Sequence, residues 1–597
     1  MCKKHLKTVL CTVLGSTIAL SSIATAFASE NDASKILSYV KVVDGQTVLI
    51  KNKDIESEKT TFNTPLLKSS ALPSSYNLAD EGYVSDIRNQ NPYGSCWSFA
   101  ALASMESNLI KSENADKNID LSEKHLVYFN YNGADSSSDK SLFAGKDTYS
   151  SLGYSPFLLG GNPLMASTTL MRRYGAVDEE KVPYEFSNGT TVDASFKNES
   201  DIYLKDFYFL PETVEFEYDD YGQVTSQTLY DDSTVANAIN TIKEYMLEYG
   251  ALASSFYASD AMSGYGTDEY WNNSKNCYYF DASTSNQLPN HGITIVGWDD
   301  NYSKNNFSIT PPKDGAWIIK NSWGDNWGNN GYFYLSYYDL SINMTSVFIA
   351  EDAKYTSDGT TIHEYENIYQ YDGVGYGGGQ VYSLTNNFKA GNFFTARDNE
   401  VLEAISTSSS YGNINVEYQV YTDLTSTVNP TLGTLVAEGS KYFELAGNYT
   451  IPLDNPVKLD KDEQYSVVIK ITFNSNGSKY TILPCETQIN NYVDIDVSSG
   501  QSSYCTMGSW KKITSSTTVS GCNIGNAIVK AYTNDILFGD IDRDNNINVK
   551  DATLLQKYIA SLEKLDDKQQ IFADANNNGS IDINDATTIQ KISASII

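Results

Sequence analysis

A cysteine, a histidine, an asparagine and a glutamine occur in an order that suits nucleophilic catalysis. Cys96 opens the segment 96–110, whose apolar residues recur at helical spacing and predict a helix. Amide groups at a helix N-terminus lower the pKa of a thiol there, and a nearby imidazolium lowers it further. Cys96 is therefore a candidate nucleophile.

The other three residue types supply what a thiolate nucleophile needs. His291 precedes an apolar run and can serve as general base, then as acid to a leaving amine. Asn321 can accept a hydrogen bond from the imidazole and fix its tautomer. Gln90 can donate its side-chain amide to an oxyanion, together with the backbone N–H of Cys96. The set predicts acyl transfer through a thioester on Cys96.

The elements that must position these residues lie between about 72 and 350. Helical patterns are predicted at 96–110, at 122–129 with Ser122 as N-cap, and at 235–249. Short apolar runs typical of strands follow at 292–297, 316–320 and 332–338. This order predicts an α+β domain with two lobes.

A second chemical pattern is a repeated acidic loop at the C-terminal end. Calcium binds six to eight oxygen atoms, and the loop spacing resembles that of an EF-hand. Each loop precedes a predicted helix, at 552–562 and at 586–597, so two Ca²⁺ ions are expected. Gly579 supplies the turn of the second loop, and Asn545 stands in its place in the first. The expected ligands are Asp540, Asp542, Asp544, Asn546, Asp551, Asp574, Asn576, Asn578, Ser580 and Asp585.

Residues 355–533 lack helical patterns and are predicted to form an all-β sandwich. Short strands such as 416–421, 449–451 and 465–471 alternate with Gly, Asn and Ser turns. A glycan is a candidate ligand of this region, because aromatic rings can stack on sugars, although core packing is the commoner use. The aromatic candidates are Tyr369, Tyr371, Tyr376 and Phe394.

The N-terminus has the pattern of an export signal. A basic start, an apolar run and Ala26-Phe27-Ala28 predict a signal peptide over 1–28, cleaved after Ala28. Residues 29–71 would then be a propeptide or N-terminal extension. No membrane span is expected after cleavage.

The net charge and the number of cysteines limit the possible partners and the disulfide pattern. The net charge of −32 argues against nucleic acid as a partner, because phosphate binding needs clustered Lys and Arg. Five cysteines follow the signal, and an odd number leaves at least one thiol unpaired. A secreted protein that is extracellular or attached to a cell surface is expected.

Residues 72–350 resemble the papain family of cysteine proteases. The resemblance rests on Leu72-Pro73, Gln90–Phe99, Leu121–Val127, Gly160-Gly161-Asn162, His291-Gly292 and Asn321-Ser322-Trp323-Gly324, in the family's order. It implies a two-lobed α+β fold in which Cys96 is the nucleophile, His291 the base and Asn321 its orienting residue. It also implies that Gln90 donates to the oxyanion, that Gly161 pairs with substrate, and that Trp323 shields the imidazole from water.

The sequence departs from that family in two ways. Tyr93 stands where the family usually has a disulfide-bonded cysteine, three residues before the nucleophile. Cys96 and His291 lie 195 residues apart, against about 130–150 in the family's usual layout. The excess predicts surface-loop insertions around 133–150 and 201–232.

The other two regions also resemble known domains. Residues 536–597, with Asp at position 12 of both loops, are similar to type I dockerin domains, a small all-α module with paired EF-hand-like loops. This implies a cohesin-bearing scaffold protein as partner, cellulosome-like or on the cell surface. Residues 355–533 look like the lectin-like β-sandwich of some bacterial papain-type proteases.

Together these patterns predict a secreted cysteine endopeptidase that acts on protein or peptide substrates and needs no catalytic cofactor. Two alternatives remain open at this stage. One is an adhesion or carbohydrate-binding protein with an inactive protease scaffold. The other is transfer of the acyl group to an amine instead of water.

Overall fold

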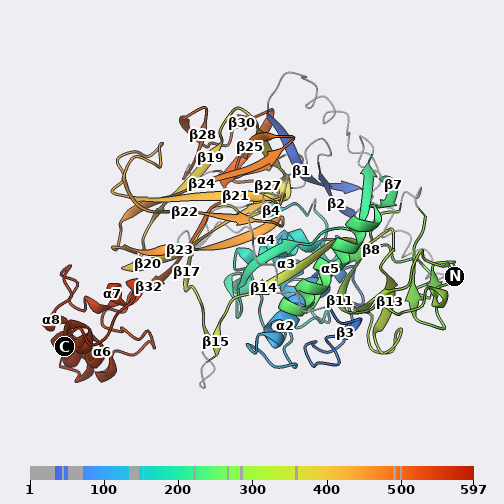
Figure 1. Cartoon of the computed structure of the whole chain (residues 1–597), viewed down its shortest axis with the longest axis horizontal. Helices are drawn as coiled ribbons and strands as arrows, with labels where there is room; N and C mark the ends of the chain where they lie inside the picture. Colours follow the sequence, from blue (N-terminus) through green and yellow to red (C-terminus); the bar gives the residue numbers. More distant parts are fainter. Residues whose placement is uncertain are drawn as a thin grey trace.

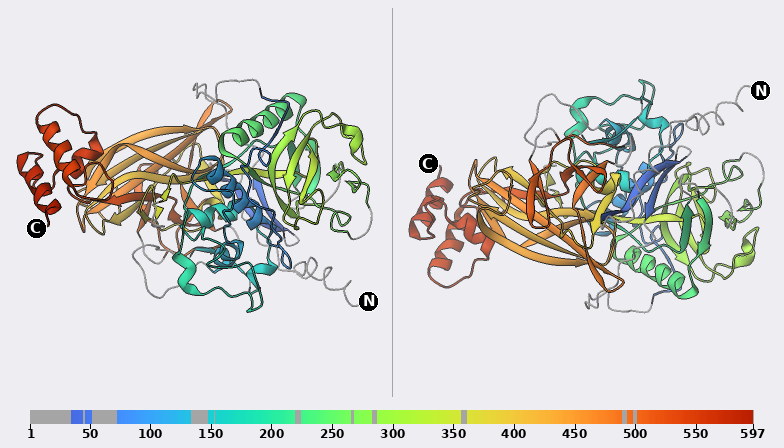
Figure 2. Two further views of the ribbon diagram at one scale, coloured as in Figure 1. Left: turned by 90° about the horizontal axis from the view of Figure 1, so that it is seen from below. Right: turned by 90° about the horizontal axis from the view of Figure 1, so that it is seen from above.

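The computed structural model describes residues 34–43, 46–51, 72–132, 147–151, 153–218, 224–264, 268–282, 287–355, 361–488, 493–497 and 501–596. The expected signal peptide and part of the extension 29–71 lie outside these residues. The β-sandwich lies between the α+β domain and a small helical domain at the C-terminal end (Figures 1 and 2).

The first lobe of the α+β domain is helical, and its central helix is buried nearly all round. The predicted helices over 96–110 and 122–129 are confirmed, and the Ser122 side chain caps the second by accepting from the His125 N–H. Trp97, Leu102 and Met105 are at most 2 % exposed, so the first helix forms the middle of the lobe. The helices are α2 (Cys96–Lys111), α3 (Glu123–Tyr131) and α4 (Pro163–Met171).

The second lobe is a mainly antiparallel sheet, in which the predicted strands at 292–297, 316–320 and 332–338 are confirmed as β11, β12 and β13. Strand β11, the longest of the lobe's central strands, is buried over its first eight residues, as expected for an uninterrupted apolar run. Helix α5 (Asp232–Tyr249) turns Val235, Ile239 and Met246 inward, in agreement with the predicted helical spacing. The strands are β3 (Ser75–Asn77), β8 (Leu252–Phe256), β9 (Trp271–Asn272), β10 (Cys277–Tyr278), β11 (His291–Asp299), β12 (Ala316–Lys320), β13 (Tyr332–Ser336) and β14 (Asn343–Ala350).

The prediction of surface loops at 133–150 and 201–232 is wrong for the described parts of both segments. Residues 201–232 contain β5 (Leu204–Phe209) and the hairpin β6 (Val214–Tyr218) and β7 (Val224–Leu229). Strand β5 pairs with β14, and Phe207 is fully buried. Asp147 and Tyr149 are also buried, and β4 (Thr148–Tyr149) pairs with β27 (Val493–Asp494) of the sandwich. These insertions build the junction between the domains.

The β-sandwich joins the α+β domain through a continuous sheet. Strand β23 pairs with β5, and Gly447 allows this approach, because a Cβ there would lie 1.9 Å from the Phe207 carbonyl oxygen. The sheet runs β17-β32-β20-β23 in the sandwich and continues as β5-β14-β8-β11-β12-β13-β10-β9. The sandwich strands of this sheet are β17 (Asn367–Tyr369), β20 (Glu400–Ser409), β23 (Gly447–Leu459) and β32 (Lys530–Asp535).

The facing sheet of the sandwich closes an apolar core that includes Val416, Tyr465 and Ile471. The N-terminal segment adds a hairpin to this sheet, since β1 (Ser34–Val43) pairs with β2 (Gln46–Lys51) and with β18. The remaining strands of the facing sheet are β18 (Gln380–Ser383), β19 (Lys389–Thr395), β21 (Ile414–Thr422), β22 (Thr434–Phe443), β24 (Gln464–Ser475), β25 (Ser478–Ile482), β28 (Ser502–Thr506) and β29 (Ser509–Lys512).

Smaller pairings complete the sandwich. Strand β26 (Cys485–Gln488) pairs with β31 (Cys522–Ala527), which also pairs with β30 (Thr518–Val519). The two-stranded sheet β15 (Lys354–Tyr355) and β16 (Thr361–Ile362) lies between the two domains in sequence.

The C-terminal domain has three helices, α6 (Val549–Ile559), α7 (Asp567–Ala573) and α8 (Ile583–Ser593). Helices α6 and α8 begin three residues before their predicted starts, because Asn548 and Asp582 cap them. Helix α7 is not predicted by the sequence; its Phe572 packs with Val401 of the sandwich and with Ile536, the residue after β32. No helix among the described residues is long and apolar enough to cross a membrane.

Candidate active site

Cys96 is the first residue of α2, so its thiol lies at the positive end of the helix. Burial raises the pKa of the thiol above its ordinary value, while hydrogen bonding to the backbone of Gly292 and Trp97 acts in the opposite direction. Cys96 forms no disulfide. Cys96 is therefore a free thiol, and a nearby base is needed to take its proton.

His291, the first residue of β11, lies where the strand meets the start of α2. A Cβ on the adjacent Gly292 would stand 3.0 Å from the carbonyl carbon of Cys96, so only glycine allows this close packing. The His291 Nε2 lies 2.8 Å from Asn321 Oδ1, which leaves Nδ1 as the ring nitrogen for proton exchange with the thiol. The Trp323 ring packs against the imidazole, with ring centroids 4.7 Å apart.

Burial changes the pKa values of both the thiol and the imidazole. Burial lowers the pKa of His291 to about 4, opposed by the hydrogen bond to Asn321. Burial therefore disfavours a lone thiolate on Cys96 and a lone imidazolium on His291. Proton transfer from Sγ to the ring would create two opposite charges, and their attraction, together with the dipole of α2, would act against the burial cost.

Gln90 lies near the N-terminus of α2, and both polar atoms of its side-chain amide make hydrogen bonds. Its Oε1 accepts from Ser322 Oγ at 2.8 Å, and its Nε2 donates to the Tyr93 carbonyl at 3.0 Å. An amide nitrogen carries two protons, so the second remains for an oxyanion. The backbone N–H of Cys96 is the other expected donor.

Gly161 lies against the indole of Trp97, the residue that follows the nucleophile. A Cβ at position 161 would stand 2.4 Å from two ring carbons of Trp97. The preceding Gly160 carbonyl accepts a hydrogen bond from the Tyr131 hydroxyl at 2.5 Å. The backbone of this glycine pair is thus fixed beside the start of α2, where the resemblance places substrate.

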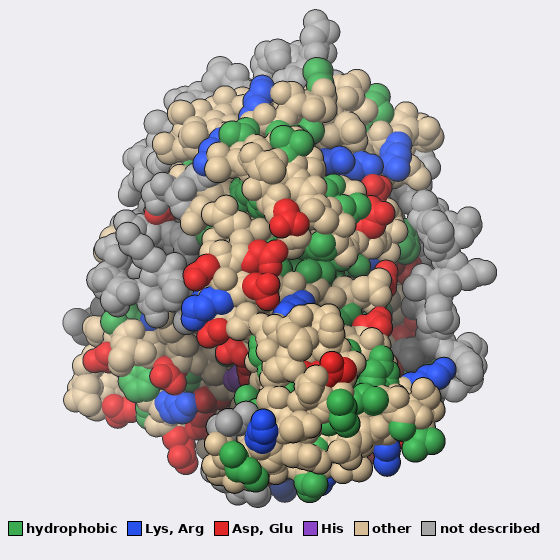
Figure 3. Space-filling model, turned by 90° about the vertical axis from the view of Figure 1, so that its left-hand side faces the viewer, with side chains coloured by type: hydrophobic (Ala, Val, Ile, Leu, Met, Phe, Trp, Pro, Cys, Tyr) green, Lys and Arg blue, Asp and Glu red, His purple; other side chains and the backbone are tan. Residues whose placement is uncertain are grey.

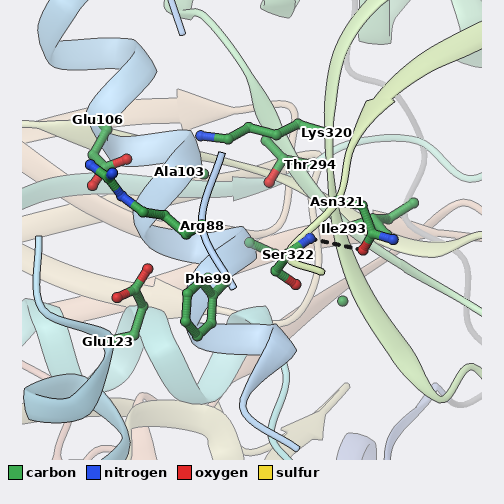
Figure 4. A pocket seen from close by; sticks show the side chains of 12 residues that line it. Arg88, Phe99, Ala103, Glu106, Glu123, Ile293, Thr294, Lys320, Asn321 and Ser322 are labelled. Atoms are coloured by element: carbon green, nitrogen blue, oxygen red, sulfur yellow. Dashed lines mark hydrogen bonds between the residues drawn. The ribbon is translucent and has the colours of Figure 1, made fainter. Parts of the chain in front are cut away.

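A buried network of Lys320, Ser85 and Glu106 lies next to Asn321 in the chain. The sequence does not predict it. Lys320 Nζ donates to both the carbonyl and the hydroxyl of Ser85 at 2.9 Å, and Ser85 donates to Glu106 at 2.5 Å. Glu106 is on α2, so the network ties the helix of the nucleophile to β12, which ends at Lys320 directly before Asn321. Figure 4 shows Lys320 reaching toward Glu106 across a small pocket, and the Ser322 N–H donating to Asn321.

Neither Lys320 nor Ser322 has a chemical signature of its own in the sequence. Both flank Asn321, and that adjacency is the one signal that could have identified them. Their roles depend on contacts with Ser85, Glu106 and Gln90, which are more than 200 residues away in the chain.

The two acidic loops fold in the same way, 34 residues apart. Asp540 accepts hydrogen bonds from the backbone N–H groups of Asp544 and Asn545, and Asp574 accepts the equivalent bonds from Asn578 and Gly579. Asn545 adopts a left-handed φ of 62°, as Gly579 does at 84°, so asparagine meets the backbone requirement of the first loop.

The first loop brings its carboxylates together as a calcium site requires. Asp540, Asp542 and Asp544 each offer an oxygen within 4.8 Å of the others, and all three are hard ligands of the kind that Ca²⁺ prefers. Asp551, at position 12, is buried and accepts from the backbone of Ile541.

The second loop keeps the equivalent positions. Asp585 accepts from the Asn576 N–H, and Asn578 Oδ1 accepts from the Ser580 N–H. At position 7 the side chain of Asn546 donates to the Asp544 carbonyl, so a backbone carbonyl remains as the ligand there, which also suits Ser580. The donor set fits Ca²⁺ in both loops.

Three of the four aromatic residues considered for sugar stacking are buried, and Tyr371 is half-buried. Tyr369, Tyr376 and Phe394 are 6 %, 0 % and 2 % exposed, and Tyr371 stacks on Phe394. The three buried rings therefore present no face on which a sugar could stack.

Comparison with known proteins identifies three regions. Residues 72–351 match the papain family cysteine proteases, residues 368–533 the lectin-like domain and residues 538–592 the type I dockerin domain. Dockerin domains of this type generally bind calcium, in agreement with the expected cofactor.

Individual relatives match the first region. Cysteine proteinase 1 of Zea mays is 26 % identical over 280 residues, which are 47 % of this chain and 60 % of the relative. Human cathepsin L2 is 27 % identical over 271 residues, 45 % of this chain and 62 % of the relative. The chain thus spans about 60 % of the length of these curated relatives.

One solved structure extends the similarity of fold across two domains. The cysteine protease and lectin-like domains of Cwp84, a surface layer associated protein of Clostridium difficile, are 22 % identical with a TM-score of 0.56. The match covers 80 % of this chain and 91 % of that one. The chain therefore carries a papain-family cysteine protease domain, followed by a lectin-like domain and a type I dockerin domain.

Proposed function

We propose that this protein is a cysteine endopeptidase that hydrolyses peptide bonds through a thioester on Cys96. The observation that carries the proposal is the convergence of Cys96, His291, Asn321 and Gln90 at the start of α2. The 2.8 Å bond between His291 and Asn321 supports a fixed tautomer, with the proton on Nε2 and Nδ1 free to act as base.

Acylation would begin with proton transfer and end with release of the amine. His291 Nδ1 takes the Sγ proton, and the thiolate attacks the carbonyl carbon of the scissile bond. The oxyanion that forms accepts hydrogen bonds from Gln90 Nε2 and the Cys96 N–H. The C–N bond then breaks, and the imidazolium gives its proton to the leaving amine.

Deacylation repeats the sequence with water. His291 removes a proton from water, the hydroxide attacks the thioester carbonyl, and the Cys96 thiolate leaves and recovers the proton. Transfer to an added amine would use the same site, and product analysis distinguishes the two outcomes.

We also propose that the dockerin domain tethers the enzyme to a cohesin-bearing scaffold outside the cell. Two Ca²⁺ ions would be held by the paired loops. The export pattern over 1–28 and the surface-layer association of the Cwp84 relative support an extracellular or cell-surface location. Acidic and basic side chains are interspersed over the described part of the face in Figure 3, as suits a protein that works in solution.

The test is turnover of a peptide library by the mature protein and by Cys96→Ala. We expect cleavage by the wild type and none by the variant, while both bind Ca²⁺ equally at the dockerin domain. An epoxide-based thiol inhibitor should label Cys96 in the wild type. A folded, calcium-loaded wild type that cleaves no peptide and takes no label would instead favour a binding protein with an inactive protease scaffold.

A further inference from the structure

The Tyr184 hydroxyl connects two parts of the loop that leads to the nucleophile. It donates to the Gln90 carbonyl at 2.7 Å and lies 2.5 Å from Ser95 Oγ. A phenol has a single proton, so Ser95 donates to the tyrosine oxygen while Tyr184 donates to Gln90. Ser95 is 1 % exposed, which keeps water from competing for these bonds.

One of the two residues joined by this hydroxyl carries an oxyanion donor, and the other is next to the residue that carries the second donor. Gln90 supplies its side-chain Nε2, and Ser95 immediately precedes Cys96, whose backbone N–H is the second donor. The distance between these donors is therefore set at both ends by one side chain, which comes from the loop between α4 and β5.

An aromatic cluster fixes the Tyr184 ring. The ring packs edge-on against Phe99 of α2 and against Phe186, with centroids 5.0 Å and 4.9 Å apart. Phe186 in turn packs on Tyr93 at 4.6 Å, and Tyr93 packs on the fully buried Phe157 at 5.4 Å.

Tyr93 links the cluster directly to the oxyanion donor. Its carbonyl accepts the hydrogen bond from Gln90 Nε2, so movement of the Tyr93 backbone would move the amide. Position 93 is where the papain family usually has a disulfide-bonded cysteine, and a tyrosine there can form no such bond. Ring packing thus braces the loop at the point where a covalent bond is absent.

We propose that Tyr184 is a positioning residue for the oxyanion hole, and that the cluster of Tyr93, Phe157 and Phe186 replaces the missing disulfide as its support. This inference rests on the proposed peptidase function and adds a residue to it. Tyr184 touches neither the substrate carbonyl nor the thiol; it acts through Gln90 and Ser95.

The test compares Tyr184→Phe with the wild type, using a fluorogenic peptide that the wild type cleaves. Loss of one oxyanion donor in other enzymes costs about 100- to 1,000-fold in kcat, and misplacing it should cost part of that. We expect kcat to fall about tenfold and KM to change less than about threefold. Tyr558→Phe, in α6 of the dockerin domain, is the matched control and should keep full activity.

Two further measurements separate positioning from a general loss of structure. The pH dependence of Cys96 alkylation by iodoacetamide does not need an oxyanion hole and should be unchanged in Tyr184→Phe. In a Gln90→Ala background, Tyr184→Phe should cost less than the tenfold expected in the wild type, because one of the two donors that it positions is already gone.

Support from the cluster is tested at Tyr93. Tyr93→Phe keeps the ring and should retain wild-type kcat, whereas Tyr93→Ala should lower kcat about as much as Tyr184→Phe does. Equal kcat in Tyr93→Ala and the wild type would overturn the role of the cluster.

The proposal for Tyr184 is overturned if Tyr184→Phe keeps kcat within about twofold, or if its effect is undiminished without Gln90. These results differ from failure of the proposed function, in which the wild type itself cleaves no peptide and its Cys96 resists the epoxide inhibitor.

Discussion

Chelation of calcium should unfold the dockerin domain and leave the protease domain intact. Without a cation, the oxygens of Asp540, Asp542 and Asp544 lie within 4.8 Å of one another and repel. The apolar core that must hold the loops together is small. Its buried members are Ile541, Ala552, Leu555, Leu565, Ala573, Ala586 and Ile589.

The magnitude follows from linkage. At free calcium about 100-fold above Kd, each ion stabilises the fold by about 2.7 kcal/mol, so two ions contribute about 5.4 kcal/mol. A core of this size supplies at most about 3–5 kcal/mol by itself. The stabilising free energy lost with the two ions should therefore exceed the free energy that the apolar core supplies. Protection of the backbone amides should fall by up to about four orders of magnitude.

Hydrogen exchange of the full chain, with and without chelator, measures the effect. Helices α6 and α8 should lose protection, while α2 in the protease domain serves as internal control. Asp551→Ala should reproduce the effect in calcium, and Glu563→Ala, which removes an exposed acid outside the loops, should not. Unchanged protection of α6 and α8 after chelation would refute the reasoning.

Three other substitutions have effects that the geometry predicts. Gly161→Ala places a methyl group about 1 Å too close to the Trp97 ring and should lower kcat/KM at least tenfold, measured with a peptide substrate. Asn321→Ala removes the acceptor of the imidazole proton and should lower kcat about 10- to 100-fold at unchanged thermal stability. Glu403→Ala breaks ion pairs with Lys568 and Arg543 and should loosen the dockerin domain on the sandwich, seen as a larger radius of gyration by X-ray scattering.

Local patterns in the sequence were sufficient for much of the fold. The apolar spacing of 96–110 and of 235–249 predicts α2 and α5, because a helix buried on one side or all round repeats its apolar residues at that spacing. The loop repeat predicts α6 and α8, but not their first turns. The capping residues Asn548 and Asp582 also belong to the loop pattern, so the pattern does not show that the helices begin directly after them.

Long-range pairing could not be predicted in the same way. Residues 204–209 form a strand because β14 and β23 pair with it on either side, and neither partner is close in sequence. The four residues expected at the active site could be named from their chemistry alone. Tyr184, Lys320 and Ser322 could not, because their roles consist entirely of contacts made after folding.

The central claim is that Cys96 and His291 ionise as a pair, and the pH profile of Cys96 alkylation tests it most directly. In the wild type the imidazole accepts the thiol proton, so alkylation should already be fast between about pH 6 and 8. In His291→Ala no acceptor remains and burial holds the thiol pKa above its ordinary 9.0, so the rate should rise only above pH 9. Identical profiles for the two proteins would contradict the account.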